Sequence, residues 1–274
     1  MALISFLLIS IVLFVLGAAV GSFLNVVIIR SFLEEDWIKG RSRCDHCRSE
    51  LVWYDMVPLL SYWWLGGACR WCKEPISLSH PVVEVLTGAL FVWWYWFGFL
   101  FFKLAEQPFT VLQPLFWLAV GLILLVIFFA DLWYFLIPDV AVVTLTVLAV
   151  LYRGSLVFYG VMHPADLTRM VVVVFAAVGF LYGLWLLTKQ KGIGFGDVKL
   201  MMPLGLLLGW PETIVSLFLA FVAGGVVGLG LLLLGKKKLK QPVPFGPFLI
   251  GSAVACLFWG EQIFAWYWRL VTGG

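Results

Sequence analysis

The sequence predicts an all-α polytopic membrane protein of about eight transmembrane segments, with one small domain between the first two. Two observations on the 274 residues predict this fold class. Hydrophobic residues make up 63% of the chain and charged residues only 12%, far from the balance of a soluble domain. The apolar residues are also gathered into runs long enough to cross a bilayer. A net charge of +3 spread over such a chain gives no indication of a nucleic-acid partner, and the lipid bilayer is the expected one.

Seven apolar runs have spanning length and an eighth is short. The seven runs are residues 3–29, 82–102, 111–130, 140–159, 170–188, 213–234 and 243–270. The short run, residues 200–209, covers about half of a ~30 Å hydrocarbon core at ~1.5 Å per residue. The first run lacks a basic segment before it, so we interpret it as a membrane helix and not as a cleaved signal peptide.

The distribution of basic residues predicts the orientation. With the amino terminus outside and every run crossing, 14 of the 18 Lys and Arg residues lie on the cytoplasmic side, as the positive-inside rule requires. These are Arg30, Lys39, Arg41, Arg43, Arg48, Arg70, Lys73, Lys189, Lys191, Lys199, Lys236, Lys237, Lys238 and Lys240. The outer side keeps Lys103, Arg153, Arg169 and Arg269. The short run therefore counts as a crossing, because otherwise the lysines at 236–240 would fall outside.

Residues 30–80 form the sizeable polar insertion and hold four of the five cysteines. Cys44, Cys47, Cys69 and Cys72 form two C-x2-C pairs separated by 21 residues, which is spacing typical of a tetrahedral zinc site. Two disulfides are the alternative, but they are rare in the reducing cytoplasm, where the charges place this loop. We therefore predict a cytoplasmic zinc-binding domain at 30–80, between a first helix at 1–29 and a seven-segment domain at 81–274. His46, between Cys44 and Cys47, could substitute as a ligand, but we favour its interpretation as an exposed bystander.

Four carboxylates lie at predicted cytoplasmic ends of membrane segments: Glu84, Asp131, Asp139 and Asp197. Asp139 and Glu84 follow prolines at helix starts, where an acid is ordinary. Asp131 ends a segment, where the helix dipole disfavours a negative charge, so a functional role is indicated. Asp197 follows a glycine-rich stretch, 192–196. Such irregular backbone is tolerated at membrane depth where it lines a protein or water-filled cavity. We therefore place Asp197 in a wet pocket near the cytoplasmic boundary.

Asp131 and Asp197 would face each other from the same side of the membrane. Two close carboxylates share one proton, which is the arrangement that an aspartic protease needs to activate water and to protonate the leaving amine. Because Asp197 begins a helix and Asp131 ends one, we assign Asp197 as base and Asp131 as acid.

Stretches along nearly the whole chain then resemble one family, the bacterial type IV prepilin peptidases among the G-x-G-D intramembrane aspartyl proteases. They are residues 21–28 (GSFLNVVI) with Arg30, the four-cysteine loop, residues 75–77 (PIS), residues 80–84 (HPVVE), residues 131–139, residues 194–199 (GFGDVK) and residues 244–248 (PFGPF). By this resemblance Asp131 and Asp197 are the catalytic pair, and Gly194, Gly196 and Lys199 belong to the supporting loop.

The resemblance implies a bifunctional enzyme of the bacterial inner membrane. It would cleave the basic leader from type IV prepilins or pseudopilins of a pilus or type II secretion system at the cytoplasmic face. It would then N-methylate the new amino terminus with S-adenosylmethionine, for which Gly21, Asn25 and Glu84 are the candidate contributors.

Two other classes of function remain open from the residues. Intramembrane carboxylates also serve proton-coupled transporters, although here the acids gather at one face and no broken segments recur in two halves. A non-enzymatic assembly factor of a pilus or secretion system is the second alternative, in which the zinc loop binds partners and the aspartates cap helices.

Overall fold

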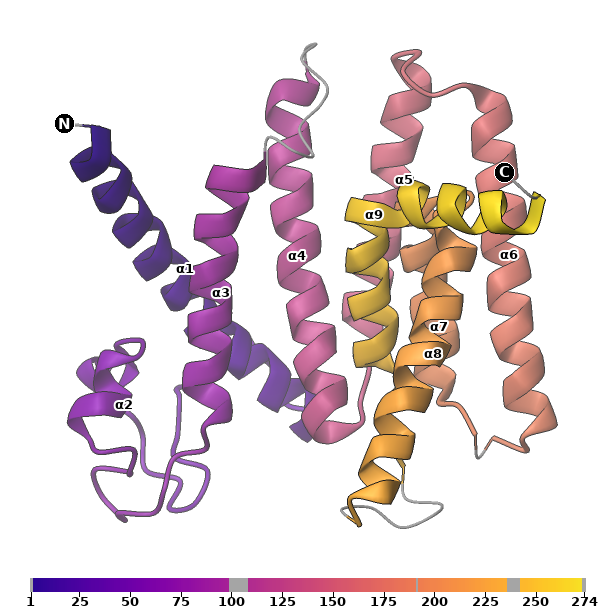
Figure 1. The fold of residues 1–274 in the computed structure, drawn as a ribbon. Helices are drawn as coiled ribbons and strands as arrows, with labels where there is room; N and C mark the ends of the chain where they lie inside the picture. Colours follow the sequence, from indigo (N-terminus) through magenta and orange to yellow (C-terminus); the bar gives the residue numbers. More distant parts are fainter. Residues whose placement is uncertain (1, 99–107, 191, 236–241, 273–274) are drawn as a thin grey trace. The chain divides into compact units, whose positions relative to one another are not determined.

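The structure, a computed structural model, describes every residue except 1, 99–107, 191, 236–241 and 273–274. The described residues form helices and loops, and their only β-type pairings are two isolated bridges (Figure 1). The all-α prediction is confirmed for this part of the chain. The chain packs as two compact units, residues 1–129 and residues 130–274. The predicted boundaries at residues 29 and 80 follow membrane topology and remain a prediction.

The first unit is built on a close helix pair. It contains α1 (Ala2–Leu33), the short helices η1 (Trp53–Met56) and α2 (Leu60–Trp64), α3 (Ser79–Phe97) and most of α4 (Phe109–Tyr134). Gly17 and Gly21 on α1 face α3, and a Cβ atom on either glycine would lie 2.8 Å from the α3 backbone. Small residues at a crossing let two membrane helices approach closely, so these glycines fix the pair. The loop between α1 and α3 folds at one end of it (Figure 1).

The second unit surrounds one short helix. It contains α5 (Asp139–Phe158), α6 (Pro164–Leu187), α7 (Phe195–Leu208), α8 (Glu212–Leu233) and α9 (Gly246–Thr272). The short helix α7 contacts α5, α6, α8 and α9, and ten of its 14 residues are buried. A helix that is apolar all round belongs inside a bundle, and this explains why most of the short run 200–209 is buried among the other helices.

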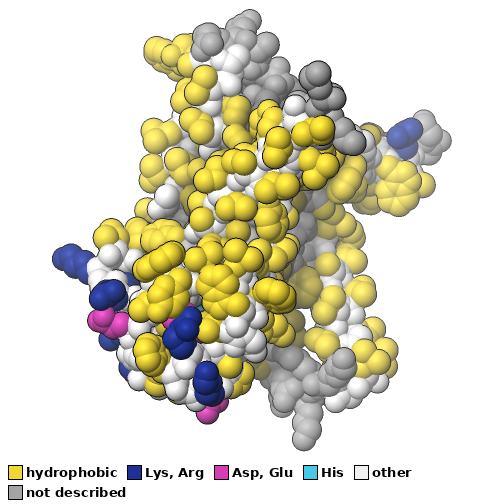
Figure 2. Space-filling view, turned by 90° about the vertical axis from the view of Figure 1, so that its left-hand side faces the viewer, with side chains coloured by type: hydrophobic (Ala, Val, Ile, Leu, Met, Phe, Trp, Pro, Cys, Tyr) yellow, Lys and Arg dark blue, Asp and Glu magenta, His cyan; other side chains and the backbone are white. Residues whose placement is uncertain are grey.

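Within the part of the chain that the structure describes, six helices satisfy the length and composition of a membrane span: α1, α4, α5, α6, α8 and α9. The helices α3 and α7 correspond to the other two predicted segments. Large hydrophobic side chains are exposed along all of these spans, which is the surface expected of helices in contact with lipid. Figure 2 shows one face covered largely by such side chains, with charged groups gathered toward the end that holds the loop.

The orientation across the bilayer remains a prediction. Of the basic residues used to predict it, Lys103, Lys191, Lys236, Lys237, Lys238 and Lys240 lie outside the described residues.

Candidate functional site

Asp197 lies in the first turn of α7, directly after the glycine-rich stretch. Its Oδ2 atom accepts a hydrogen bond from the backbone N–H of Gly194, the residue before the helix, at 3.1 Å. This contact satisfies one of the backbone donors that a helix leaves unpaired at its start. The Oδ1 atom is buried and has no hydrogen-bond partner among the described residues. Asp197, which is 5% exposed, therefore keeps one carboxylate oxygen for another group.

Asp131 lies in the last turn of α4, as the sequence predicts for the end of that segment. It is 6% exposed, and its Oδ2 atom accepts a hydrogen bond from the backbone N–H of Gly246 at 2.9 Å. Gly246 is the first residue of α9. A Cβ atom at this position would lie 2.6 Å from the same oxygen, so glycine is the residue that fits here.

The two aspartates belong to the same unit and interact electrostatically. Each accepts a hydrogen bond from backbone at the beginning of a helix, α7 for Asp197 and α9 for Asp131. We assigned Asp197 as base and Asp131 as acid because Asp197 begins a helix and Asp131 ends one. The structure does not support this distinction, because Asp131 also contacts the positive amino-terminal end of a helix, α9. The acid and base roles remain a prediction.

The third acid of this region, Asp139, is separate from the pair. It is the first residue of α5, and its exposed carboxylate binds the Nζ atom of Lys199 at 2.7 Å. This placement agrees with its interpretation as a helix-start acid. Lys199 also lies 5.1 Å from the centre of the Phe195 ring, so the lysine ties the beginning of α7 to the beginning of α5.

The glycines before α7 matter because they lack a side chain and leave room for neighbouring atoms, not because they adopt unusual backbone angles. Neither Gly194 nor Gly196 has a positive φ angle. At Gly196 a Cβ atom would lie 3.0 Å from the Cβ atom of Ile137, in the segment that follows α4. The absence of a side chain lets α7 begin against that segment, which carries the chain on from Asp131.

The four predicted zinc ligands meet in the first unit. The Sγ atoms of Cys44, Cys47, Cys69 and Cys72 all lie within 4.8 Å of one another, and those of Cys44 and Cys72 are 3.9 Å apart. A tetrahedron with Zn–S bonds of ~2.3 Å separates its sulfurs by about 3.8 Å, so the cluster fits a single zinc ion. All four thiols are free, and His46 is exposed and outside the cluster.

The two cysteine pairs have the same backbone geometry, offset by 25 residues. Cys44 N–H donates to Ser49 O and Arg48 N–H to Cys44 O; likewise Cys69 N–H donates to Glu74 O and Lys73 N–H to Cys69 O. Arg48 and Lys73 occupy the left-handed region, with φ angles of 59° and 61°. The Ser49 hydroxyl, 2.9 Å from the Cys47 sulfur, and the Ser49 backbone lower the pKa of Cys47 to about 6. Each pair is thus a preformed half of a metal site, and the thiolate of Cys47 is readily available.

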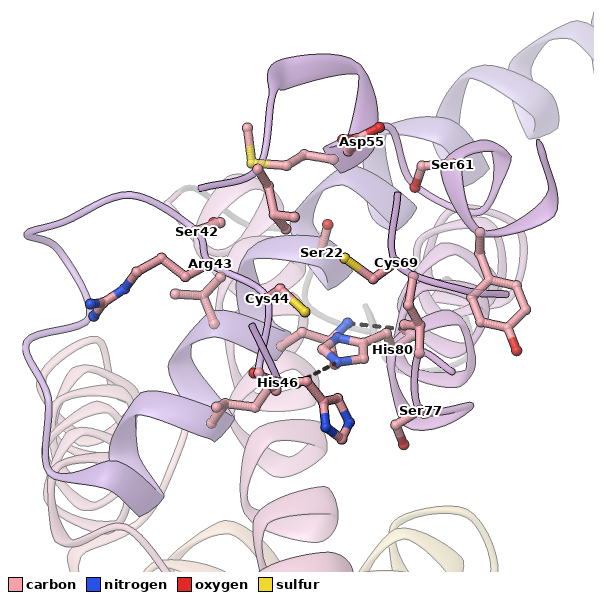
Figure 3. Close-up of a pocket in the computed structure, with 18 of the residues that line it drawn as sticks. Ser22, Ser42, Arg43, Cys44, His46, Asp55, Ser61, Cys69, Ser77 and His80 are labelled. Carbon is pink, nitrogen blue, oxygen red and sulfur yellow. Dashed lines mark hydrogen bonds and ion pairs between the residues drawn. The ribbon is translucent and has the colours of Figure 1, made fainter. Parts of the chain in front are cut away.

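A pocket of about 590 Å³ opens between the helix pair and the cysteine loop. This volume lies within the range of small-molecule sites. In Figure 3 the side chains of Ser22, Cys44, Cys69 and His80 gather in the centre of the view. Asn25 and Glu84 also line it. The Nδ2 atom of Asn25 donates to the His80 carbonyl at 3.0 Å, so α1 and the start of α3 are joined at the pocket wall.

Glu84 does not begin a helix, and its interpretation as a helix-start acid is wrong. Because α3 starts at Ser79, Glu84 lies in the second turn, where it is buried and its Oε2 atom accepts a hydrogen bond from Leu59 N–H at 2.7 Å. Leu59 has a φ angle of 59°, so this carboxylate holds a strained residue of the loop. Gly21 does not line the pocket but contacts α3 at the Glu84 backbone.

Three contributors were not predicted. Gly246 contacts Asp131 although it lies 115 residues later in the sequence. The only sequence signal for Gly246 was its membership of the 244–248 motif. Arg70 and Asp55 form an ion pair at the pocket, with N–O distances of 2.6–3.2 Å, and the Arg70 guanidinium lies 4.9 Å from the Tyr54 ring centre. Two opposite charges in one polar loop gave no signal that they would pair.

Comparisons with known proteins place this arrangement in a family. A model of the bacterial peptidase A24 N-terminal domain matches residues 15–97, and a model of the type IV leader peptidase family matches residues 118–229. The relatives include proteins named prepilin leader peptidase/N-methyltransferase. The one from Aeromonas hydrophila is 34% identical over 93% of this chain and 92% of its own length. Those from Legionella pneumophila and Pseudomonas aeruginosa are each 31% identical, over 91% and 90% of this chain and 91% and 89% of their own.

No solved structure matches the chain. The two family models follow one another along the chain in the order of its two units. The first covers the cysteine loop with its pocket, and the second covers both buried aspartates. With relatives above 30% identity over more than nine-tenths of its length, the chain belongs to the type IV leader peptidase family.

Proposed function

We propose that this protein removes the leader peptide from type IV prepilin-like precursors and then methylates the new amino terminus. Asp131 and Asp197 carry out the cleavage. The observation that carries the proposal is the pair itself: two buried carboxylates of one unit interact electrostatically, and one oxygen of Asp197 has no partner among the described residues. Such an oxygen can accept a proton from water or share one with the second carboxylate.

In the cleavage step one aspartate is ionised and the other carries a proton. The ionised carboxylate takes a proton from a water molecule as the water oxygen attacks the carbonyl carbon of the scissile bond. The protonated carboxyl donates a hydrogen bond to the carbonyl oxygen. When the C–N bond breaks, a proton passes to the leaving nitrogen, which becomes the new amino terminus. The Gly194 and Gly246 N–H groups hold one oxygen of each carboxylate throughout.

The distribution of basic residues supports cleavage at the cytoplasmic face of the inner membrane. The precursor would lie with its apolar helix in the bilayer beside the enzyme, while its basic leader stays in the cytoplasm. The short length of α7 supports a pocket that opens near the membrane boundary, because Asp197 begins a helix that cannot span the core by itself. Water can then reach the scissile bond from the cytoplasm.

The methylation step belongs to the first unit. The four cysteine thiolates would hold a structural Zn²⁺ that closes the loop against the helix pair. The adjacent pocket is large enough for S-adenosylmethionine, which supplies the methyl group when bound. Asn25 and Glu84 line that pocket and contribute by holding its wall, and Gly21 acts by keeping α1 and α3 close. Burial of the Glu84 carboxylate excludes water beside it.

A reconstituted assay tests the proposal. Purified protein in proteoliposomes is mixed with a leader-bearing prepilin, and cleavage is followed as a gel shift. We expect Asp131→Asn and Asp197→Asn to abolish the shift, because an amide cannot exchange the proton. Asp139→Asn is the matched control and retains cleavage, since that exposed acid contacts Lys199 and is outside the pair. Normal cleavage by either of the first two variants would refute the dyad.

A second arm tests methylation by itself. Pilin that has already been cleaved is mixed with the enzyme and a radiolabelled methyl donor. We expect Asp197→Asn to retain label transfer and Glu84→Gln to lose most of it, because the amide binds the Leu59 N–H less strongly than a carboxylate does. Label transfer at the normal rate by Glu84→Gln would remove Glu84 from the methylation site.

A further inference from the structure

Arg153 is one of the four basic residues on the predicted outer side, and its guanidinium binds the far end of α7. The Nε atom donates to the Leu206 carbonyl at 2.9 Å and an Nη atom donates to the Leu207 carbonyl at 2.6 Å. These carbonyls belong to the last turn of α7, where a helix leaves its acceptors unpaired. A cation at this end also complements the helix dipole.

The length of α7 makes this contact necessary. Its 14 residues extend about 21 Å, less than the ~30 Å of the hydrocarbon core. One end of the helix therefore lies inside the apolar layer, where bare carbonyl groups are costly. Two neighbouring helices provide donors to the carbonyl groups at this end. Arg153 comes from α5. The Thr213 hydroxyl, from α8, donates to Gly209 O at 2.6 Å and lies 3.3 Å from Gly205 O. Glu212 interacts electrostatically with Arg153.

The helices α5 and α7 are also joined at their other ends. Lys199, in the first turns of α7, binds Asp139, the first residue of α5, at 2.7 Å. Thus α5 and α7 run in the same direction with one polar contact near each end. The Lys199 pair is exposed and its strength is limited by solvent. The Arg153 contacts lie among packed helices, so they determine how far α7 can slide along α5.

We infer that Arg153 is a positioning residue that fixes the depth of α7 and thereby holds Asp197 opposite Asp131. This inference rests on the proposed dyad. Asp197 lies nine residues before Leu206, so a shift of the rigid helix at one end displaces the carboxylate at the other. Because Asp131 is held by α9 and not by α7, such a shift changes the separation of the two aspartates. The guanidinium of Arg153 contacts the carbonyls of Leu206 and Leu207 and, among the described contacts, neither aspartate.

The test compares kcat and KM for prepilin cleavage in proteoliposomes. Arg153→Met keeps an unbranched apolar stem but removes the guanidinium and its donors, and we expect kcat to fall at least tenfold while KM changes less than twofold. Arg153→Lys keeps one charged donor and should recover at least a third of the wild-type kcat. Arg169→Met is the matched control, since Arg169 is a predicted outer-side arginine whose ion pair with Asp166 is exposed. Its kcat should equal that of the wild type.

A thiol-accessibility measurement follows the position of α7 without activity. In an Ile137→Cys variant the introduced thiol lies against Gly196 at the start of α7, so α7 shields it. Alkylation of this thiol by a maleimide, detected by mass spectrometry, should be at least fivefold faster when Arg153→Met is added. An unchanged alkylation rate together with wild-type kcat overturns the inference. An equal loss of kcat in Arg153→Lys and Arg153→Met with an unchanged alkylation rate also overturns it, because the position of α7 would not be what changed.

Comparing Asp197→Asn with Arg153→Met in the same assay separates a failure of this inference from a failure of the proposed function. If Asp197→Asn cleaves normally, the dyad is refuted and the positioning role fails with it. If Asp197→Asn is inactive while Arg153→Met cleaves normally, the dyad stands and the role of Arg153 alone is refuted.

Discussion

Replacing Gly246 by alanine should impair cleavage by moving Asp131 and leaving every ionisable group in place. The added Cβ atom would lie 2.6 Å from Oδ2 of Asp131, whereas ordinary contact begins near 3.4 Å. The carboxylate therefore retreats by about 0.8 Å, the difference of these two distances, or α9 moves away by a similar amount. A misplacement of ~1 Å in an active site costs about 100-fold in rate. We expect kcat to fall about 10- to 100-fold, with KM within about twofold.

The assay is the initial rate of prepilin cleavage in proteoliposomes over a range of precursor concentrations. Gly251→Ala is the control, because Gly251 lies in the same helix and a Cβ atom there would meet nothing within 4 Å. That variant should keep the wild-type kcat, and alanine favours the helix by ~1 kcal/mol relative to glycine. A wild-type kcat in Gly246→Ala would refute the contact between α9 and Asp131 as the structure has it.

The cysteine loop gives three further predictions. Cys44→Ser should lose the bound zinc in metal analysis while Cys256→Ser keeps it, because Cys256 is buried in α9 outside the cluster; retained zinc in the first variant would contradict the site. Lys73→Gly should bind zinc at least as tightly as the wild type in chelator competition, since glycine adopts a φ angle of 61° without strain, whereas Lys73→Val should bind it more weakly. Asp55→Asn should make the loop more sensitive to limited proteolysis by weakening the ion pair with Arg70, and equal sensitivity would show that the pair has no structural effect.

The helices could be predicted from the sequence because each membrane helix satisfies its backbone hydrogen bonds within its own segment. Apolar runs of spanning length have few alternatives in a bilayer. The run 140–159 corresponds to α5 at Asp139–Phe158, and the run 213–234 corresponds to α8 at Glu212–Leu233. The start of α6, at Pro164, lies six residues before the predicted run 170–188, and the start of α7, at Phe195, lies five residues before the predicted run 200–209. Polar residues such as Asp166 and Asp197 begin these helices, and hydropathy alone does not count them.

The local parts of the site were also accessible from the sequence. Spacing predicted the four-cysteine cluster, because two C-x2-C pairs present thiolates from short turns. The dependence of Asp131 on Gly246 was not accessible, since it joins residues 115 positions apart through one N–H group. The role of Glu84 was misjudged for a related reason. Its partner Leu59 lies in an irregular loop whose path no periodicity describes.

The aspartates and the pocket beside the cysteine loop belong to different packing units, and under the proposed function this division into two reaction centres has a consequence for the substrate. Under the proposed function, the freshly cut pilin leaves one reaction centre with a bare amino group and has to be handed to another. Some molecules escape during that transfer, so the ratio of unmodified to methylated product measures the competition between release and capture. Diluting the enzyme in the membrane should change that ratio without altering the intrinsic rate of either reaction.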